Sequence, residues 1–423
     1  MRRTSPTLLI LLSSLFASMN LSASEMPESA ETSTSAGDPD AVVPVDEYFP
    51  QIVEGMHLFG TSLAKPLSNA ALREGKNFFF SPYSIGTAWT MASLGGSDSV
   101  RSEMFSAFGG QFDLKPEYIQ EGNAALRQLL LNHSSGSLQI ANAIWVNKDI
   151  SLVDAYQKEL QKSFGAEVAN LDFSAPGAVT QINKYVSDHT AGMIPKLLDR
   201  TDPSALTYLI NTVALKVKWE KKFDKALTKE QSFTSADGSS GQVQMMRQKG
   251  QFTYMRSRTI EGVSLDTVGG EFAIELFLPV TARTPEELSD LADLSALQWW
   301  EDQFADNKKG ELFLPRLKLD YSADLIPAIK GLGIQKPFRP GENFSRMVNG
   351  PSAISLILHK ATLELDEEGA SAAAATGAAM TRSIVLRDDS FTLKFDRPFL
   401  VAIRHKVSRS ILFFGIVNNP QQQ

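Results

Sequence analysis

The peptide bond between Arg382 and Ser383 is the part of this sequence best suited to chemistry, and that chemistry is cleavage by another protein. A trypsin-like protease cuts after a basic residue when the surrounding segment is exposed. Residues 370–379 read ASAAAATGAA and are almost all very small. Because such a run has little to bury, we expect residues 370–382 to form an exposed arm that offers this bond to a protease.

Residues that could make this protein itself a catalyst are scarce. The sequence has no cysteine, no Gly-x-Ser-x-Gly or His-Glu-x-x-His motif and no glycine-rich phosphate loop with its lysine. The lack of cysteine also excludes disulfides, thiol nucleophiles and cysteine-bound zinc. We therefore predict that the protein is not an enzyme and has no catalytic residue, no metal site and no cofactor. Its histidines are His57, His133, His189, His359 and His405.

The arm must be positioned by the segments on either side of it, residues 354–365 and 391–395, which are predicted to be β-strands. Alanine is the best helix former and is depleted in strands, so composition alone also fits a flexible linker or a helix. At a spacing of two residues, however, one face is uncharged and small enough to enter a crowded sheet as an additional strand. That face consists of Ala370, Ala372, Ala374, Thr376, Ala378 and Met380.

The start of the arm resembles the hinge of inhibitory serpins, whose pattern is a glutamate, a charged residue, a glycine and then mostly small residues. Other segments similar to this family follow in the family's order, among them 77–85 (NFFFSPYSI), 140–146 (IANAIWV), 218–223 (KWEKKF) and 396–400 (DRPFL). The residues that match the hinge are Glu367, Glu368, Gly369, Ala370, Ser371, Ala372, Ala373, Ala374, Ala375 and Thr376.

The resemblance implies an α+β serpin fold. Its features in the family are a large, mostly antiparallel central sheet, additional sheets, about nine helices and an exposed reactive-centre loop. In this sequence the loop would span roughly residues 367–387, within a single domain of residues 46–420. The chain has 423 residues and is 43% hydrophobic, which is sufficient for one large core.

The resemblance also assigns roles to residues outside the loop. Ser81, Ser84, Asn211 and His359 match the family's shutter, a polar cluster that controls whether strands of the central sheet separate. Trp219 matches the top of that sheet, where the loop would enter. On general chemistry alone, His359 would simply be a buried histidine with satisfied hydrogen bonds, since it ends an apolar strand segment.

The function implied by the resemblance is that of a secreted serine-type endopeptidase inhibitor that acts as a suicide substrate. A protease attacks the loop, forms a covalent acyl-enzyme and is trapped as the cut loop inserts into the central sheet. The partner would be a trypsin-like serine protease. The alternatives are a non-inhibitory serpin that acts as a binding protein, carrier or chaperone, or an inhibitor of elastase-like or subtilisin-like proteases.

Two neighbouring bonds are candidates for the reactive bond. The bond between Arg382 and Ser383 follows from chemistry, because an arginine fits the acidic pocket of trypsin-like enzymes. Counting from Gly369 by the commonest family spacing gives the bond between Ser383 and Ile384 instead, which suits a protease with a small pocket. Met380 is a third possibility for subtilisin-like or chymotrypsin-like enzymes.

The N-terminal region predicts export. Two arginines precede an apolar run at residues 8–17, and small residues follow, which is typical of a signal peptide in residues 1–24. Residues 25–45 are rich in serine, threonine and acidic residues and are predicted to be a disordered linker. We expect a secreted protein, extracellular or periplasmic, without a transmembrane segment.

Charge limits the remaining partners. The net charge of −7 at pH 7 disfavours nucleic acid and anionic membranes, and we expect a monomer. One local basic run is interrupted by Glu220 and Asp224, so we interpret it as a solvated face. The run consists of Lys216, Lys218, Lys221, Lys222 and Lys225.

Overall fold

A computed structural model describes residues 45–109, 115–131, 136–282, 284–341, 343–369 and 390–421. The predicted signal peptide, the linker as far as residue 44 and residues 370–389, which include the predicted arm at 370–382, lie outside these described residues. The described residues belong to one compact unit, Val43–Gln423. None of the helices in this part of the chain is long and apolar enough to cross a membrane.

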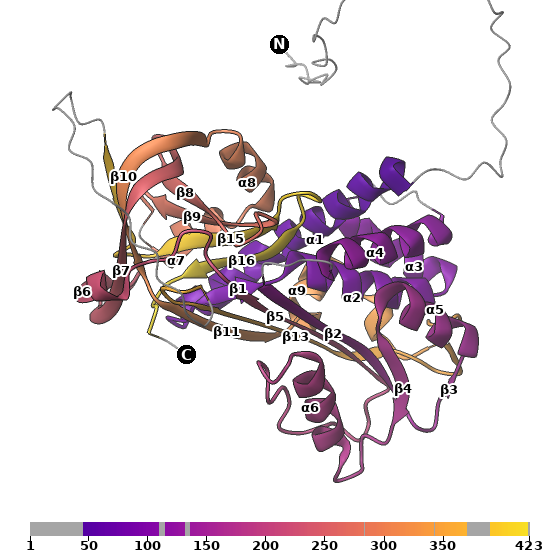
Figure 1. The fold of residues 1–423 in the computed structure, drawn as a ribbon. Helices are drawn as coiled ribbons and strands as arrows, with labels where there is room; N and C mark the ends of the chain where they lie inside the picture. The colour runs from indigo at the N-terminus through magenta and orange to yellow at the C-terminus, as the bar shows by residue number, and fades with distance from the viewer. Residues whose placement is uncertain are drawn as a thin grey trace, which may run out of the picture. The chain divides into compact units, whose positions relative to one another are not determined.

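The central sheet has the strand order β11-β13-β5-β2-β4 (Figure 1). Its inner strands β13 (Ile354–Leu365) and β5 (Thr207–Val217) run parallel to each other. Around them, β11 (Leu317–Asp324) is antiparallel to β13, β2 (Gly136–Asn147) is antiparallel to β5, and β4 (Glu167–Leu171) is parallel to β2. Neighbouring residues of β5 are buried on both faces, as in a sheet covered on both sides.

A second sheet contains nine of the described strands. Its path is β1 (Phe78–Phe80), β16 (Ile411–Val417), β15 (Phe399–His405), β9 (Phe272–Pro279), β8 (Ile260–Asp266), β7 (Ser240–Arg256), β10 (Ala305–Pro315) and β14 (Phe391–Lys394), and β6 (Lys229–Thr234) pairs with β7. The strand that follows the predicted arm, β14, pairs in parallel with β10. A short third sheet consists of β3 (Ser151–Leu152) and β12 (Val348–Asn349).

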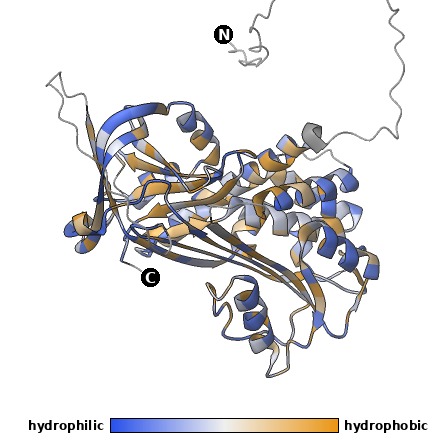
Figure 2. Cartoon of the chain, viewed as in Figure 1, coloured by the Kyte–Doolittle hydropathy of each residue, from blue (hydrophilic) through white to orange (hydrophobic). Residues whose placement is uncertain are grey.

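Nine α-helices lie in the described residues, and together with the three sheets they confirm the predicted α+β class. The central sheet is mixed rather than mostly antiparallel as predicted, because two of its four strand pairings, β13 with β5 and β2 with β4, are parallel. Figure 2 shows that surface helices such as α6 carry both hydrophilic and hydrophobic residues, as expected for helices with one face against a sheet and one face in water. The α-helices are α1 (Val45–Arg73), α2 (Pro82–Gly95), α3 (Asp98–Phe105), α4 (Pro116–Leu131), α5 (Asp154–Phe164), α6 (Ala178–His189), α7 (Pro285–Asp290), α8 (Leu294–Glu301) and α9 (Ile326–Gly331). The short 3₁₀ helices are η1 (Ser106–Phe108), η2 (Lys225–Leu227) and η3 (Lys336–Phe338).

Helix α2 reaches the centre of the molecule, and every one of its residues is buried. Ser81 caps its N-terminus by accepting a hydrogen bond from the N–H of Ser84 over 3.1 Å, and Pro82 occupies the first turn, where it leaves no backbone donor unpaired. Gly86 allows the close approach of α1, because a Cβ there would lie 2.6 Å from Cγ of Met56. The first turn of α2 is connected to the inner strands of the central sheet through hydrogen bonds of Ser81 and Ser84.

The opposite face of the central sheet is covered by α6 (Figure 1). Ile182 and Val186 of this helix pack into an apolar cluster with Trp145 of β2 and Tyr208 of β5. The hydroxyl of Tyr185 donates to the backbone oxygen of Asn142 in β2 over 2.8 Å and so fixes the helix to the strand. Any polar group at the middle of β5 is therefore shielded from water on both faces.

Candidate functional site

The four side chains predicted as the shutter meet at the centre of the molecule. Ser81, Ser84, Asn211 and His359 are each 0% exposed. The N–H of Ser81 donates to Nε2 of His359 over 3.2 Å, and Nδ1 of His359 lies 2.7 Å from Oδ1 of Asn211. The Asn211 amide donates to the backbone oxygen and the hydroxyl of Ser84, at 2.9 and 2.6 Å. One continuous network thus joins α2, β5 and β13.

This network fixes the protonation state of His359. Because Nε2 accepts the hydrogen bond from Ser81, the ring proton resides on Nδ1, which donates it to the oxygen of Asn211. Loss of hydration on burial lowers the pKa of His359 from 6.5 to about 3. The ring is therefore neutral at physiological pH and connects two elements through hydrogen bonds.

A fifth residue, Asn142 of β2, belongs to the same cluster, although it was not among the residues predicted from the sequence. It lies directly opposite Asn211 in the pairing of β2 with β5, and its Oδ1 accepts a hydrogen bond from the Asn211 amide over 2.6 Å. An asparagine in the middle of the apolar segment 140–146 was the available signal, because a buried amide needs a partner. We call Ser81, Ser84, Asn142, Asn211 and His359 the shutter cluster.

The predicted hinge begins with a tight turn at the end of β13. The N–H of Gly369 donates to the backbone oxygen of Asp366 over 3.2 Å, and Oδ1 of Asp366 accepts from the N–H of Glu368 over 2.9 Å. Gly369 has φ 93°, a left-handed conformation that glycine adopts more readily than other residues. The chain therefore reverses direction after β13, and the glycine of the hinge pattern has a conformational reason.

Glu367 is the most deeply buried side chain of this turn, at 1% exposure. Its carboxylate accepts hydrogen bonds from Nε of Arg316, at 2.9 and 3.0 Å, and from the hydroxyl of Thr228, at 2.6 Å. Its backbone oxygen accepts from the N–H of Phe223 over 3.0 Å. Burial raises the pKa of Glu367, but the hydrogen bonds from Arg316 and Thr228 outweigh that effect and hold the pKa below 4.5.

Trp219 and two lysines hold the turn from the side of β5. The indole N–H of the buried Trp219 donates to the backbone oxygen of Asp366 over 2.6 Å. The carboxylate of Glu368 lies 2.7 Å from Nζ of Lys222 and 3.6 Å from Nζ of Lys225, and the hydrogen bond from Lys222 lowers its pKa. Two lysines interpreted as part of a solvated face thus pair with the hinge. We call Trp219, Lys222, Lys225, Thr228 and Arg316 the hinge clamp.

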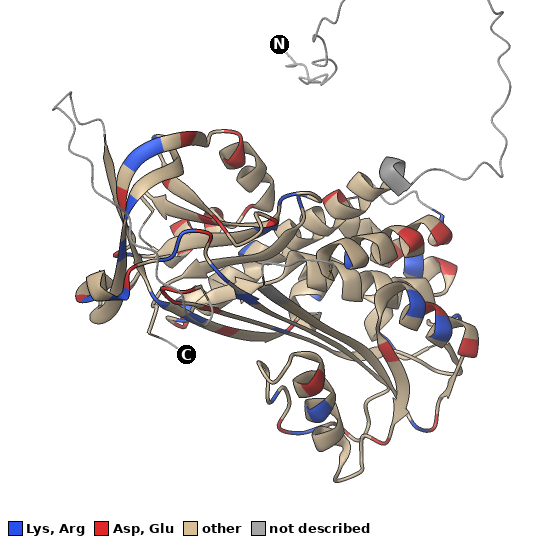
Figure 3. Ribbon diagram, viewed as in Figure 1, with Lys and Arg blue, Asp and Glu red and all other residues tan. Residues whose placement is uncertain are grey.

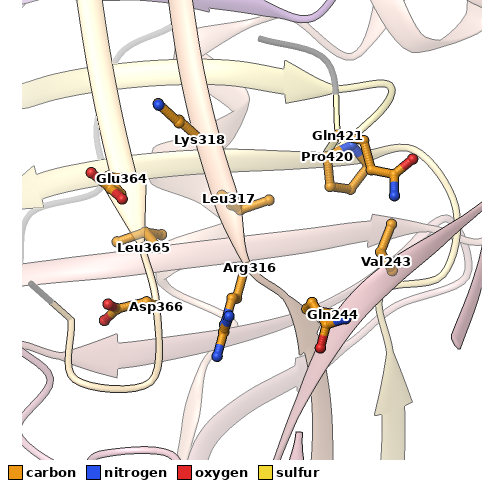
Figure 4. A pocket seen from close by; sticks show the side chains of 10 residues that line it. All are labelled: Val243, Gln244, Arg316, Leu317, Lys318, Glu364, Leu365, Asp366, Pro420 and Gln421. Atoms are coloured by element: carbon orange, nitrogen blue, oxygen red, sulfur yellow. The ribbon is translucent and has the colours of Figure 1, made fainter. Parts of the chain in front are cut away.

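A cavity of about 590 Å³ lies beside the hinge turn (Figure 4). Arg316 and Asp366 lie at one end of it, and Lys318 and Glu364, from the paired strands β11 and β13, lie at the other. Acidic and basic residues are also interspersed around β6 (Figure 3). Because its two cations face two carboxylates, the cavity has no net charge that would select an ionic ligand.

The residues of the predicted reactive bond lie outside the described residues. This applies to Arg382 and Ser383, to Ile384 of the alternative bond, and to residues 370–376 of the hinge. The structure therefore places the beginning of the hinge, the shutter cluster and Trp219. In the part of the chain that it describes, no three histidine, aspartate or glutamate side chains gather as a metal site would require.

Comparisons with known proteins agree with this fold. The family model described as serpin (serine protease inhibitor) matches residues 54–420. Serpin B10 of Rattus norvegicus is 32% identical over 391 residues, which cover 86% of this chain and 98% of the relative. Alpha-1-antichymotrypsin of Homo sapiens is 30% identical, with 86% of this chain and 87% of the relative covered. The chain belongs to the serpin family.

Solved structures give the same result. The native structure of tengpin, a thermophilic serpin, matches with a TM-score of 0.79 and 25% identity over 87% of this chain and 94% of that chain. Human thyroxine-binding globulin matches with a TM-score of 0.78 and 26% identity over 88% of this chain and 100% of that chain. The similar proteins thus include an antichymotrypsin and a thyroxine-binding protein. Membership of the family alone therefore does not establish the activity of this chain, which has to be inferred from its own site.

Proposed function

We propose that this serpin is an exported inhibitor of serine proteases that acts as a suicide substrate. The observation that carries the proposal is the hinge turn beside the parallel strands β13 and β5. A segment that follows the turn back along the sheet runs antiparallel to β13. Because β5 is parallel to β13, the same segment is antiparallel to β5 too, and it can form antiparallel hydrogen bonds with both strands.

The dimensions of this position suit the predicted arm. β13 has 12 residues and β5 has 11, and the arm at residues 370–382 is of similar length. At ~3.3 Å per residue, the inserted arm spans roughly 43 Å. Its inward face carries no charge, and a buried unpaired charge would oppose insertion by several kcal/mol. Both properties support insertion of the arm between the two strands.

The chemistry belongs to the target protease. Its serine oxygen attacks the carbonyl carbon of Arg382, the peptide bond to Ser383 breaks, and the new amino group takes the proton that the protease's histidine removed from the serine. The protease is then joined to Arg382 through an ester, and the arm is no longer held at both ends. Insertion of the arm moves the attached protease along the sheet before water can hydrolyse the ester.

We assign Arg382 as the residue that enters the specificity pocket, and a trypsin-like protease as the target. Ser383 would direct the inhibitor to an elastase-like enzyme and Met380 to a subtilisin-like or chymotrypsin-like one. The thyroxine-binding relative gives weight to a second candidate, a non-inhibitory binding protein. Export rests on the predicted signal peptide in residues 1–24.

The test is to mix the mature chain, without the predicted signal peptide, with trypsin, elastase and subtilisin in parallel. Denaturing gels and intact mass spectrometry then show whether a covalent complex forms and where the released fragment begins. We expect a stable complex with trypsin and a fragment that starts at Ser383. A fragment that starts at Ile384 transfers the reactive position to Ser383, and cleavage without any complex contradicts inhibition and leaves the binding protein.

A further inference from the structure

A polar cavity of about 420 Å³ lies between the turn that joins β6 to β7 and the segment that joins β14 to β15. Its volume is in the range of pockets that bind small molecules. It shares no residue with the shutter cluster or the hinge clamp. The lining residues that could contact a ligand through charges or hydroxyl groups are Ser232, Thr234, Ser235, Lys394, Asp396 and Arg397.

The charged groups of this cavity are not balanced. Lys394 and Arg397 share the single carboxylate of Asp396, with Nζ of Lys394 at 3.6 Å and Nη1 of Arg397 at 3.3 Å. Both distances exceed the length of about 2.8 Å that is typical of a charge-assisted hydrogen bond. All three side chains are about one-third exposed, at 38%, 31% and 34% for the lysine, arginine and aspartate. One positive charge therefore remains available at the wall of the cavity.

The guanidinium of Arg397 also has hydrogen-bonding capacity left. Its Nη2 donates to the backbone oxygen of Pro279 over 3.3 Å, whereas its Nε is buried and has no hydrogen-bond partner among the described residues. Buried polar atoms in folded proteins nearly always have a partner. The arginine is thus held in place, but its donors are only partly used.

The hydroxyl side of the cavity is preorganised by its backbone. The N–H of Ser235 donates to the backbone oxygen of Ser239 over 2.8 Å, and the N–H of Thr234 donates to the backbone oxygen of Asp396 over 2.9 Å. The second bond fastens the end of β6 to the segment that carries both cations. The hydroxyl groups of Ser232 and Ser235 form no hydrogen bond to another described side chain or backbone group, so both can donate to a ligand.

We propose that this cavity binds a small molecule through a phosphate or sulfate group. Two cations and adjacent hydroxyl donors are the groups that recognise a tetrahedral oxyanion. The volume exceeds that of the bare anion and leaves space for an attached group such as a sugar ring. The ligand would connect the β6–β7 turn to β14 and β15 and so stabilise the position of β14, the strand that follows the arm. This site is independent of protease inhibition.

Isothermal titration calorimetry on the full-length chain tests the site, with inorganic phosphate, inorganic sulfate and glucose 6-phosphate as probes and glucose as the uncharged control. Titration to about 20 mM detects a site with a Kd of ~1 mM. We expect Lys394→Gln to weaken binding about tenfold and Ser235→Ala to weaken it about threefold, because each removes one donor to the anion. Asp396→Asn should tighten binding, since it removes the competing carboxylate.

The matched control is Lys229→Gln, which removes an exposed lysine of β6 outside the cavity and should leave the Kd unchanged. Circular dichroism identifies any variant that fails to fold. If Lys394→Gln does not fold, Ser235→Ala and Asp396→Asn still test the site, because they are expected to change the Kd in opposite directions. Tighter binding of glucose 6-phosphate than of phosphate supports an organic ligand, and equal or weaker binding supports the free anion. No heat with any anion, or equal weakening by Lys229→Gln, overturns the proposal.

Discussion

The shutter cluster in the middle of the central sheet is built from neutral side chains, whereas the hinge clamp at the end of β13 is built largely from ion pairs. Asn211 and His359 are fully buried, and their hydrogen bonds connect side chains that have no access to water. At the hinge turn, Glu367 is almost as fully buried, but the side chain of its partner in the clamp, Arg316, is 46% exposed. The middle of β13 and the turn that follows its end are therefore held by two different kinds of interaction.

The difference determines how each region responds to its surroundings. A buried hydrogen bond between neutral groups is insensitive to salt, and its loss leaves unsatisfied groups in a medium of low polarity. A partly exposed ion pair is screened by salt, and its charged groups can be hydrated again when the contact breaks. We expect the shutter cluster to contribute more to stability than the hinge clamp does, and the hinge clamp to respond more strongly to salt.

The largest effect is expected for Asn211→Ala. The substitution leaves Nδ1–H of His359 without an acceptor and the buried Ser84 and Asn142 without their donor, and each such loss costs roughly 1–3 kcal/mol. We predict that the free energy of unfolding falls by about 3–5 kcal/mol in total. Denaturant unfolding followed by tryptophan fluorescence measures this difference.

The exposed Gln298→Ala of α8 is the control, and we expect its effect to be under about 0.5 kcal/mol. Asn142→Ala sharpens the test, because Asn142 bonds to the same amide. The double variant should lose less stability than the sum of the two single variants, since both remove one shared interaction. Additive effects would mean that Asn142 does not belong to the shutter cluster.

The next effect is a pH dependence that originates in His359. The pKa of this residue is about 3 in the folded protein and about 6.5 when unfolded, so between these values the unfolded chain binds a proton that the folded chain does not. The contribution of His359 to the free energy of unfolding is fully present above pH 6.5 and is lost as the pH falls from 6.5 toward 3. The contribution of His359 should amount to about 2 kcal/mol between pH 7 and pH 5.

The measurement is the difference in unfolding free energy between the wild type and His359→Gln as a function of pH. This difference isolates His359, because His57 also has a pKa of about 3 and contributes a similar slope to both proteins. The wild type should lose more stability than the variant on acidification. Parallel curves would show that the ring of His359 is not buried in its neutral form.

The shutter cluster illustrates how far the sequence could predict this site. General chemistry identified His359 only as a buried histidine, and it was the family resemblance that associated it with Ser81, Ser84 and Asn211. Asn142 was missed because its contact depends on the register between β2 and β5, which the strand sequences alone do not specify. The α+β fold was predictable because many matching segments follow one another in the family's order.

The hinge clamp could be predicted only in part. The hinge pattern and Trp219 were recognised, but Arg316 reaches Glu367 from the segment between β10 and β11, and no local pattern connects the two. Lys222 and Lys225 were interpreted as solvated, since charge spacing along the chain does not reveal a carboxylate that arrives from a distant strand. Long-range ion pairs between exposed segments leave little trace in a single sequence.

A smaller effect than those of the shutter cluster is expected for Glu367→Gln. The variant keeps the shape of the side chain but loses the charge that Arg316 and Thr228 contact. We predict a loss of about 1–2 kcal/mol, because Arg316 remains hydrated when its partner is neutral. Glu364→Gln, at an exposed position of β13, is the matched control. An effect of Glu367→Gln no larger than that of Glu364→Gln would exclude Arg316 as a significant partner.

The smallest effect on stability, and the clearest effect of salt, is expected for Glu368→Gln. Glu368 pairs with Lys222 and Lys225 near the surface, where ions reach both partners. At high ionic strength the Debye length is only about 3 Å, so the attraction is screened and the wild type should lose the benefit of the charge. The thermal midpoint of the wild type should therefore decrease from low to high salt relative to that of Glu368→Gln.

Asn211→Ala, measured alongside, should show the same salt dependence as the wild type, because its lost contacts are neutral. If Glu368→Gln and the wild type respond identically to salt, the lysines do not hold the hinge electrostatically, and the clamp is reduced to Trp219, Thr228 and Arg316.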